Sequence, residues 1–161
     1  RLRCDWSSDV CSSDLTMAYA ELHCISNYSF LRGASHPEEL VQQAASLGYT
    51  AIAITDECTM AGVVKAHTAA KECGIKLIVG SEFQLDEALH LVLLAPNRTA
   101  YGQICNLITI GRRRADKGEY RLSLDDFEFA TDQCLAIWLP RLPEQQRTQQ
   151  KQQAQIGRAH V

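Results

Sequence analysis

Ligand-type side chains stand at or near the predicted ends of successive short strands in the first 90 residues. In chain order they are His23, Asp56, Glu57, Glu82 and His90. Imidazole and carboxylate groups together suit zinc, manganese or iron better than magnesium. A metal cluster held by these groups would lower the pKa of a bound water and clamp phosphate oxygens during in-line attack. The residue types therefore indicate metal-assisted cleavage of phosphate esters.

The segment 19–33, YAELHCISNYSFLRG, contains only half of a common metal-binding pair. Many metal-dependent phosphoesterases have His-x-His here, because one strand end can direct two imidazoles at one metal cluster. In this sequence His23 takes the first position and Ile25 the second. Isoleucine offers no ligand atom, so the pattern predicts a metal-site scaffold that lacks one ligand.

Several of these side chains also have an ordinary structural interpretation. A carboxylate at a strand end, such as Asp56, often caps the following helix. His90 lies within an apolar strand pattern, where a hydrogen-bonded core histidine is the alternative to a metal ligand. We expect His36 to belong to a helix cap and His67 to a helix surface, without catalytic roles.

The elements that must position these side chains alternate between strand and helix patterns. Apolar strands are expected at 19–23, 49–55 and 75–79, with helices at 35–48 and 59–74 between them. The first helix has capping-box spacing at Ser35 and Glu38, Thr59 opens the second, and glycine ends both. This alternation predicts α/β units around a parallel sheet, whose carboxyl edge collects the candidate ligands.

The pattern changes after Glu82, which we expect to end the third strand after the turn residues Gly80 and Ser81. A strand at 89–95 follows so closely that it should pair antiparallel with the segment before it. Further along the chain, the patterns predict a helix over 97–113 with Tyr101, Ile104, Leu107, Ile108 and Ile110 inward, a short helix capped by Ser123, and a strand over 134–139.

Charge, cysteines and hydropathy narrow the class of protein. The net charge of −3 argues against the whole chain being a nucleic-acid grip. One dense basic patch, Arg112, Arg113 and Arg114, fits either phosphate contacts with DNA or a neighbouring domain, or a solvated helix end favoured by the helix dipole. Cysteines without paired spacing are expected to be small buried hydrophobic residues with reduced thiols in the cytosol. The longest apolar run, 91–95, is too short to span a membrane.

The two ends differ from the rest of the chain. Residues 1–15 lack an amphipathic period and a signal-peptide core. Their codons, and those for IGRAHV at 156–161, resemble the two complementary strands of a common sequencing-library adapter. We therefore expect adapter translation at both ends, one partial domain over 16–140, and a Gln-rich truncated helix or linker over 141–155, all cut from a longer gene.

Five segments together resemble one protein family. They are AELHCISNYSFLRGASHPEEL, LGYTAIAITDECTMAGVVKAH, GIKLIVGSEF, LVLLAPNR and GRRRADKGEYRLSLDDFE. In this order they resemble the N-terminal PHP (polymerase and histidinol phosphatase) domain of bacterial C-family DNA polymerases, within the error-prone branch. The resemblance covers essentially residues 18–140.

The resemblance implies a site and a fold. The fold would be the first part of a distorted (β/α)7 barrel whose strand ends hold up to three metals. His23 matches the first ligand, Glu82 the bridging glutamate and His90 the histidine of the fourth strand. Asp56-Glu57 stands where the family has Asp-His. The remaining ligands would lie beyond residue 155, which leaves a partial site for Zn²⁺ or Mn²⁺.

The resemblance also implies a parent protein and its partners. The parent would be a bacterial cytoplasmic, DNA-directed DNA polymerase that extends primers opposite damaged template during translesion synthesis and damage-induced mutagenesis. Its Mg²⁺ site would lie outside this chain, and its partners would be DNA, deoxynucleoside triphosphates, other polymerase domains and replication or mutagenesis proteins. Three alternatives stay open: a stand-alone PHP phosphoesterase, a PHP-linked 3′–5′ proofreading exonuclease, and an inert structural module.

Overall fold

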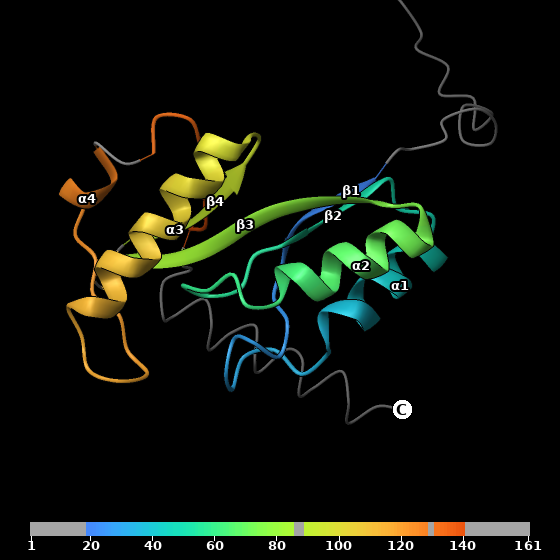
Figure 1. Cartoon of the computed structure of the whole chain (residues 1–161), viewed down its shortest axis with the longest axis horizontal. Helices are drawn as coiled ribbons and strands as arrows, with labels where there is room; N and C mark the ends of the chain where they lie inside the picture. Colours follow the sequence, from blue (N-terminus) through green and yellow to red (C-terminus); the bar gives the residue numbers. More distant parts are fainter. Residues whose placement is uncertain (1–18, 86–88, 129–130, 141–161) are drawn as a thin grey trace, which may run out of the picture.

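The computed structural model describes residues 19–85, 89–128 and 131–140. The adapter-like ends and the Gln-rich segment predicted from the sequence lie outside these residues. In chain order the elements are β1 (Ala20–Cys24), α1 (Pro37–Ser46), β2 (Ala51–Ile54), α2 (Val63–Cys73), β3 (Lys76–Leu85), β4 (Leu89–Ala95), α3 (Arg98–Arg113), α4 (Asp125–Glu128) and β5 (Leu135–Trp138) (Figure 1).

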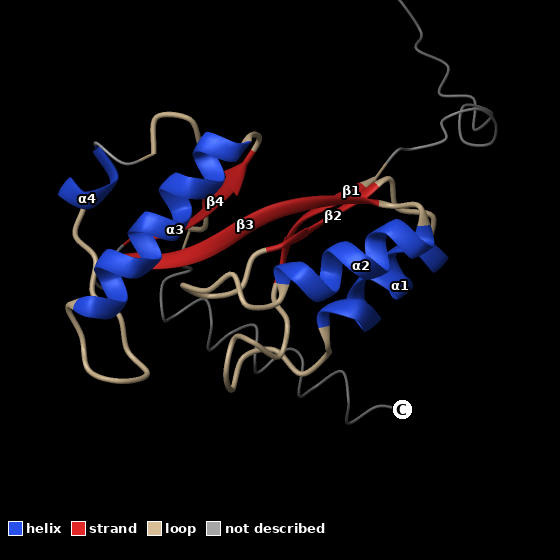
Figure 2. Cartoon of the chain, in the orientation of Figure 1, coloured by secondary structure: helices blue, strands red, loops and turns tan. Residues whose placement is uncertain are grey.

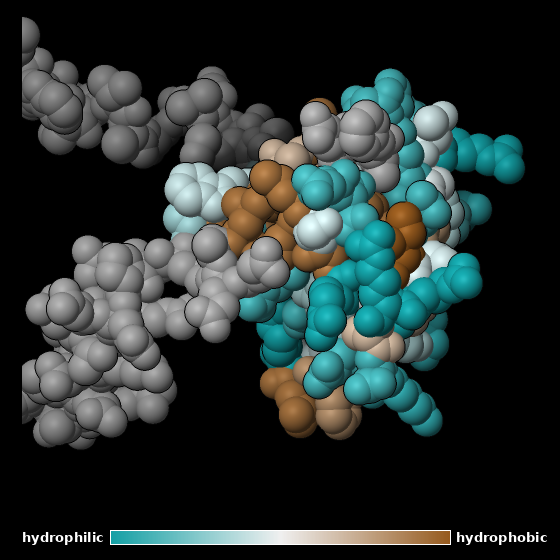
Figure 3. Space-filling view, turned by 90° about the vertical axis from the view of Figure 1, so that its left-hand side faces the viewer, coloured by the Kyte–Doolittle hydropathy of each residue, from teal (hydrophilic) through white to brown (hydrophobic). Residues whose placement is uncertain are grey.

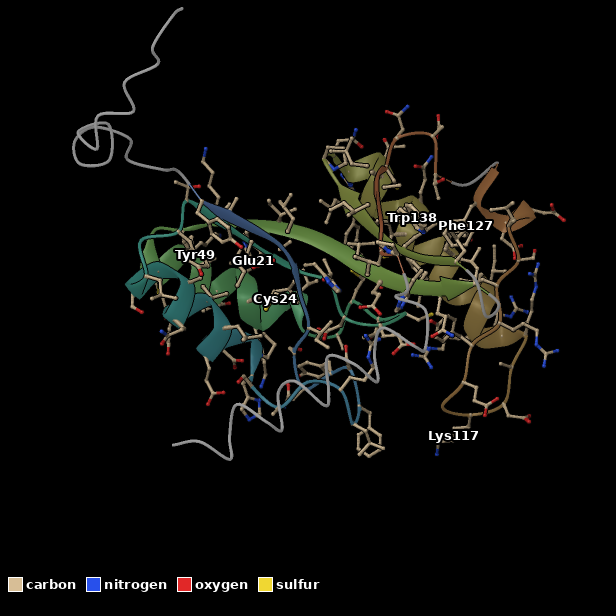
Figure 4. All side chains as sticks on the ribbon, turned by 180° about the vertical axis from the view of Figure 1, so that it is seen from behind. Glu21, Cys24, Tyr49, Lys117, Phe127 and Trp138 are labelled. Atoms are coloured by element: carbon tan, nitrogen blue, oxygen red, sulfur yellow. The ribbon has the colours of Figure 1, made fainter. Side chains whose placement is uncertain are left out.

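The strands form one curled sheet in the order β1-β2-β3-β4-β5. The first three strands are parallel, and β3–β4 and β4–β5 are antiparallel. The helices α1, α2 and α3 cover one face of this sheet, whereas the view from behind shows β1, with Glu21 and Cys24, in front of the helices (Figures 2 and 4). The expected α/β architecture, part of a barrel, is confirmed.

The strand period of two decides which side chains meet the helices. Ile52 and Ile54 of β2 pack against α1 and α2, and Phe83 and Leu93 pack against α3. The residues between them, such as Val92, point to the opposite side, which we call the open face. Ligand-type residues that alternate with these core residues must therefore share the open face.

The third strand does not end at Glu82, as the sequence had suggested. β3 continues to Leu85 because β4 pairs with it antiparallel from Val79 onward. Gly80 is a strand residue rather than a turn residue, since a Cβ there would lie 2.6 Å from the carbonyl oxygen of Leu93. Glycine is needed at this point for the close approach of two strands.

Both of the first two helices begin later than expected. Pro37 occupies the first turn of α1, so His36 is its N-cap, and the His36 amide donates to Glu39 Oε2 at 2.8 Å. The capping box is therefore shifted by one residue from Ser35 and Glu38. Thr59 does not open α2 but accepts a bond from the Ala61 amide in the turn before that helix.

The later elements follow the predictions closely. Asn97 caps α3 by accepting from the Ala100 amide, while Ile104 and Leu107 are fully buried. Tyr101, predicted to point inward, is 41% exposed. Leu124, Leu135 and Trp138 are also exposed. The space-filling view shows apolar surface between polar side chains on the face that it draws (Figure 3). No described helix is long and apolar enough to cross a membrane.

Candidate functional site

The site is built around Glu82, which lies on β3 beyond the carboxyl end of β2. Its neighbour Phe83 packs against α3, so the alternation of the strand turns Glu82 to the open face. The Glu82 side chain is fully buried. His23 Nε2 lies 2.8 Å from Glu82 Oε2, and His90 Nε2 lies 2.6 Å from Glu82 Oε1. The fold thus gathers three of the predicted residues around one carboxylate.

An arginine that the sequence analysis did not select completes this cluster. Nη1 of Arg32 lies 2.6 Å from Glu82 Oε1 and 2.7 Å from Glu57 Oε2. Arg32 belongs to the loop between β1 and α1, and its side chain is 36% exposed. One guanidinium nitrogen therefore bridges two carboxylates, one from the loop after β2 and one from within β3.

Electrostatics follow from these contacts. Burial by itself raises the pKa of the Glu82 carboxyl, but hydrogen bonds from His23 and Arg32 outweigh it and hold this pKa at about 2. Burial disfavours the charge on Arg32, yet its bonds to Glu82 and Glu57 raise the pKa of the guanidinium above its ordinary value. The buried carboxylate and the arginine are therefore a charged pair.

Asp56 is held by hydrogen bonds from the loop after β1, and its part in a metal site stays a prediction. It is 1% exposed. Its Oδ1 accepts from the Ser26 amide at 2.7 Å and from Ser29 Oγ at 2.8 Å, and its Oδ2 accepts from Ser26 Oγ at 2.7 Å. These bonds tie the loop after β1 to the end of β2. The loop-bonding alternative accounts for every contact of this carboxylate in the described structure.

Glu57 links the cluster to a second group of side chains. Tyr120 donates its hydroxyl to Glu57 Oε1 at 3.0 Å and accepts from the Gln84 amide at 2.8 Å. Burial is the main cause that raises the pKa of Tyr120. A pocket of about 270 Å³ lies beside these residues, lined by Glu57, Gln84, Tyr120, Arg121 and Leu122.

The donor atoms are of the types that zinc or manganese prefers, but their arrangement does not fit a metal ion. No group of three or more His, Cys, Asp or Glu side chains among the described residues is placed to share one ion. Both oxygens of Glu82 contact His23, His90 or Arg32 instead. The Nε2 of His90 is buried and has no hydrogen-bond partner among the described residues, although it lies 2.6 Å from Glu82 Oε1.

The basic patch is divided among three different environments. Arg112 turns toward the protein, where it donates to the carbonyl of Cys58 and lies over the ring of Tyr120. Arg114 pairs with Asp126 at 2.6 Å. Arg113 is exposed. A contact of this patch with nucleic acid stays a prediction.

The five cysteines of the described chain are all free thiols. Only Cys58 is fully buried, and burial raises its pKa to about 11. Cys73 is exposed. The prediction of small buried hydrophobic cysteines therefore holds for one of the five.

The cluster of His23, the buried Glu82 and His90 agrees with the family to which the sequence can be assigned. The family model described as "PHP domain" matches residues 21–139. The chain belongs to the PHP domain family.

Two named relatives are more than half identical to this chain over the aligned residues. The chain is 60% identical over 124 residues to an error-prone DNA polymerase of Teredinibacter turnerae and 60% identical over 132 residues to one of Methylococcus capsulatus. These alignments cover 77% and 81% of this chain but 12% of each relative. The resemblance to the error-prone branch is confirmed, and the chain spans about an eighth of the relatives' length.

Solved structures support the same fold. A putative metal-dependent phosphoesterase from Bifidobacterium adolescentis aligns with a TM-score of 0.50 and 29% identity, over 58% of this chain and 33% of that one. An amidohydrolase from Chromobacterium violaceum, solved with bound sulfate and no metal, aligns with a TM-score of 0.50 and 27% identity over the same shares. Metal dependence is stated of the Bifidobacterium adolescentis protein and not of this chain.

Proposed function

We propose that this chain is the PHP-domain part of an error-prone DNA polymerase that extends primers opposite damaged template. One observation supports this most strongly: 60% identity to polymerases of that name over nearly the whole described region. The parent would be a DNA-directed nucleotidyltransferase acting in translesion synthesis and DNA repair. DNA and deoxynucleoside triphosphates would be its substrates, and two Mg²⁺ ions in a palm domain outside this chain would assist the transfer.

We propose a bacterial cytoplasmic location and contacts with other polymerase domains and with replication or mutagenesis proteins. The reduced state of the described cysteines supports the location. Two surfaces suit domain contacts: the exposed Arg113, and the apolar side chains Leu135 and Trp138 on the last described strand. Arg113 would favour an acidic or phosphate-bearing neighbour.

Within that parent, we propose that the PHP domain acts mainly as a scaffold. The ligand-type residues contact one another and Arg32 rather than leaving an open coordination site. A Zn²⁺ or Mn²⁺ ion, as predicted from the sequence, would use His23, His90 and Glu82, and would have to displace Arg32 from the carboxylate. Metal binding at this centre would therefore cost the contact between Arg32 and Glu82.

The test is to extend the reading frame at its source locus and purify the full-length product. We expect a frame of the relatives' length with clustered palm aspartates, and primer extension across an abasic site by the purified protein. Replacing those aspartates by alanine should abolish extension. A frame that stops soon after the barrel closes, with phosphomonoesterase activity on small substrates, would support the stand-alone alternative instead.

The proofreading alternative has its own test. Ile25→His restores an imidazole at the second position of the predicted His-x-His pair. We expect this change to leave the parent without 3′–5′ exonuclease activity, because Arg32 still contacts Glu57 and Glu82. Degradation of a mismatched primer by unmodified parent would contradict the scaffold proposal and favour the exonuclease.

A further inference from the structure

We propose that the guanidinium of Arg32 takes the place of a metal cation in this PHP centre. It holds Glu57 and Glu82 together, so the centre is closed and ordered without a divalent ion. The inference concerns this chain's own residues and stands whether or not the parent is a polymerase.

The first argument is charge. Glu82 is fully buried, and a buried carboxylate stays ionised only where nearby charges or hydrogen bonds compensate for its lost hydration. Arg32 is permanently charged and reaches both Glu82 and Glu57 through a single nitrogen, at 2.6 and 2.7 Å. A bridge between two carboxylates from neighbouring parts of a sheet is the task that a metal ion performs in a carboxylate-histidine cluster.

The second argument is that the loop delivers Arg32 as a fixed structure. The amides of Arg32 and Gly33 both donate to the Ser29 carbonyl at 3.0 Å, and Ser29 is itself bound to Asp56. A Cβ at Gly33 would lie 2.0 Å from the Ser26 carbonyl oxygen, so the loop closes on itself where only glycine fits. Arg32 therefore starts from an anchored backbone rather than from a free surface loop.

The third argument is backbone strain next to the arginine. Leu31 has φ of 61°, a left-handed conformation that is unfavourable for a residue with a Cβ. Its side chain is 90% exposed and gains nothing from burial. The strain is kept because the bonds on either side of Leu31, those of Ser29 and of the Arg32 guanidinium, fix the chain.

The Arg32 guanidinium and a metal cation also exclude each other. A cation bound by His23, His90 and Glu82 would lie close to the Arg32 guanidinium, and two positive charges repel at that separation. Ile25 supplies no donor that could strengthen the metal against this repulsion. The guanidinium and a divalent ion are therefore alternative occupants, and the sequence favours the guanidinium.

The experiment uses the full-length natural product of the locus, with Arg32→Gln, Arg32→Lys and the control Arg98→Gln on the exposed first turn of α3. Zinc and manganese are measured by mass spectrometry after dialysis, and hydrogen exchange is followed in the peptide 26–35. For the unchanged protein we expect less than about 0.2 equivalents of either metal, because an intact site would retain its ion through dialysis. EDTA should not alter its exchange.

In Arg32→Gln, exchange in 26–35 should rise about tenfold, because a charged hydrogen bond is lost. Added Mn²⁺ should reverse part of that rise only in this variant. Arg32→Lys keeps the charge and should stay free of metal and largely protected, which keeps the test valid if Arg32→Gln fails to fold. About one equivalent of metal in the unchanged protein, loosening by EDTA, or unchanged exchange in Arg32→Gln would each overturn the proposal.

Discussion

Asp56 and Glu82 are two buried carboxylates near one edge of the same sheet, yet the protein satisfies them in opposite ways. Asp56, 1% exposed, takes its bonds from the amide and hydroxyl of Ser26 and the hydroxyl of Ser29. Glu82, 0% exposed, faces Arg32 and two imidazoles. Neutral donors surround the first, whereas cationic or potentially cationic groups surround the second.

The difference separates a carboxylate that anchors a loop from one that lies among ligand-type side chains. Neutral donors on one loop make three hydrogen bonds to Asp56, two to Oδ1 and one to Oδ2. Glu82 faces the open side of the sheet with histidines from β1 and β4, the composition of a metal centre. In this chain an arginine fills that centre. The ligand type of a residue therefore does not decide its role until its partners are known.

Asp56→Ala is expected to have the largest effect on stability of the changes considered for the two carboxylates. This change leaves three donors of Ser26 and Ser29 unpaired inside the protein, and we expect a loss of about 4 kcal/mol in stability. Loss of hydrogen-exchange protection in β2 and in 26–35 would show it. The matched control Asp116→Ala, in the exposed turn after α3, should change protection little. Equal effects of both changes would contradict the anchoring role of Asp56.

Gly33→Ala tests whether the loop shared by both carboxylates needs its close backbone contact. The new methyl group would meet the Ser26 carbonyl oxygen at 2.0 Å, so we expect a loss of about 3 kcal/mol. Gly102→Ala on α3, where nothing lies within 4 Å of the added carbon, should instead stabilise by about 0.5–1 kcal/mol. Thermal shifts in the same direction for the two variants would be inconsistent with this account.

A double-mutant cycle sharpens the comparison between the two carboxylates. Arg32→Gln and Glu82→Gln should be coupled by about 1–2 kcal/mol, a value reduced by the partial exposure of Arg32. Arg32→Gln and Asp56→Asn should show coupling below about 0.5 kcal/mol, because no contact joins these side chains. Exchange protection of the six proteins in the two cycles (the unchanged protein, the three single variants and the two double variants) gives both values. Similar coupling in the two cycles would remove the distinction.

The smallest effect is expected for the exposed pair Arg114–Asp126, which sets the scale for surface charges. Arg114 is 49% exposed, so Arg114→Gln should cost at most about 0.5 kcal/mol and less at high salt. Denaturation at two salt concentrations measures this. A cost equal to that of Arg32→Gln would mean that burial of Glu82 does not strengthen its pair.

Much of the fold was predictable because its elements follow simple periodicities. Alternating strand and helix patterns gave the parallel first half, and the short spacing before 89–95 gave the antiparallel turn. The predicted end of β3 was wrong. Glycine is typical of turns, but Gly80 lies within the strand, where it allows the close approach of Leu93. Helix starts shifted because Pro37 fixed one cap and the Thr59 turn delayed the other.

The site was predictable in its ligand types but not in its arrangement. The fold brings His23, Glu82 and His90 together, although Glu82 lies within β3 and not at its end. Arg32 was missed because its role depends on how the loop returns across the sheet, which no period encodes. The only local signs were the glycine after Arg32 and the small polar residues Ser26 and Ser29 before it, which mark a tight turn without showing its direction.

Crystallographic data collected above the zinc and manganese absorption edges test the central claim most directly. They need a crystal of the full-length protein grown with both ions present. We expect electron density for Arg32 between Glu57 and Glu82, and no anomalous peak near His23 or His90. An anomalous peak for an ion bound by these histidines and Glu82, with the Arg32 side chain turned away, would contradict the account.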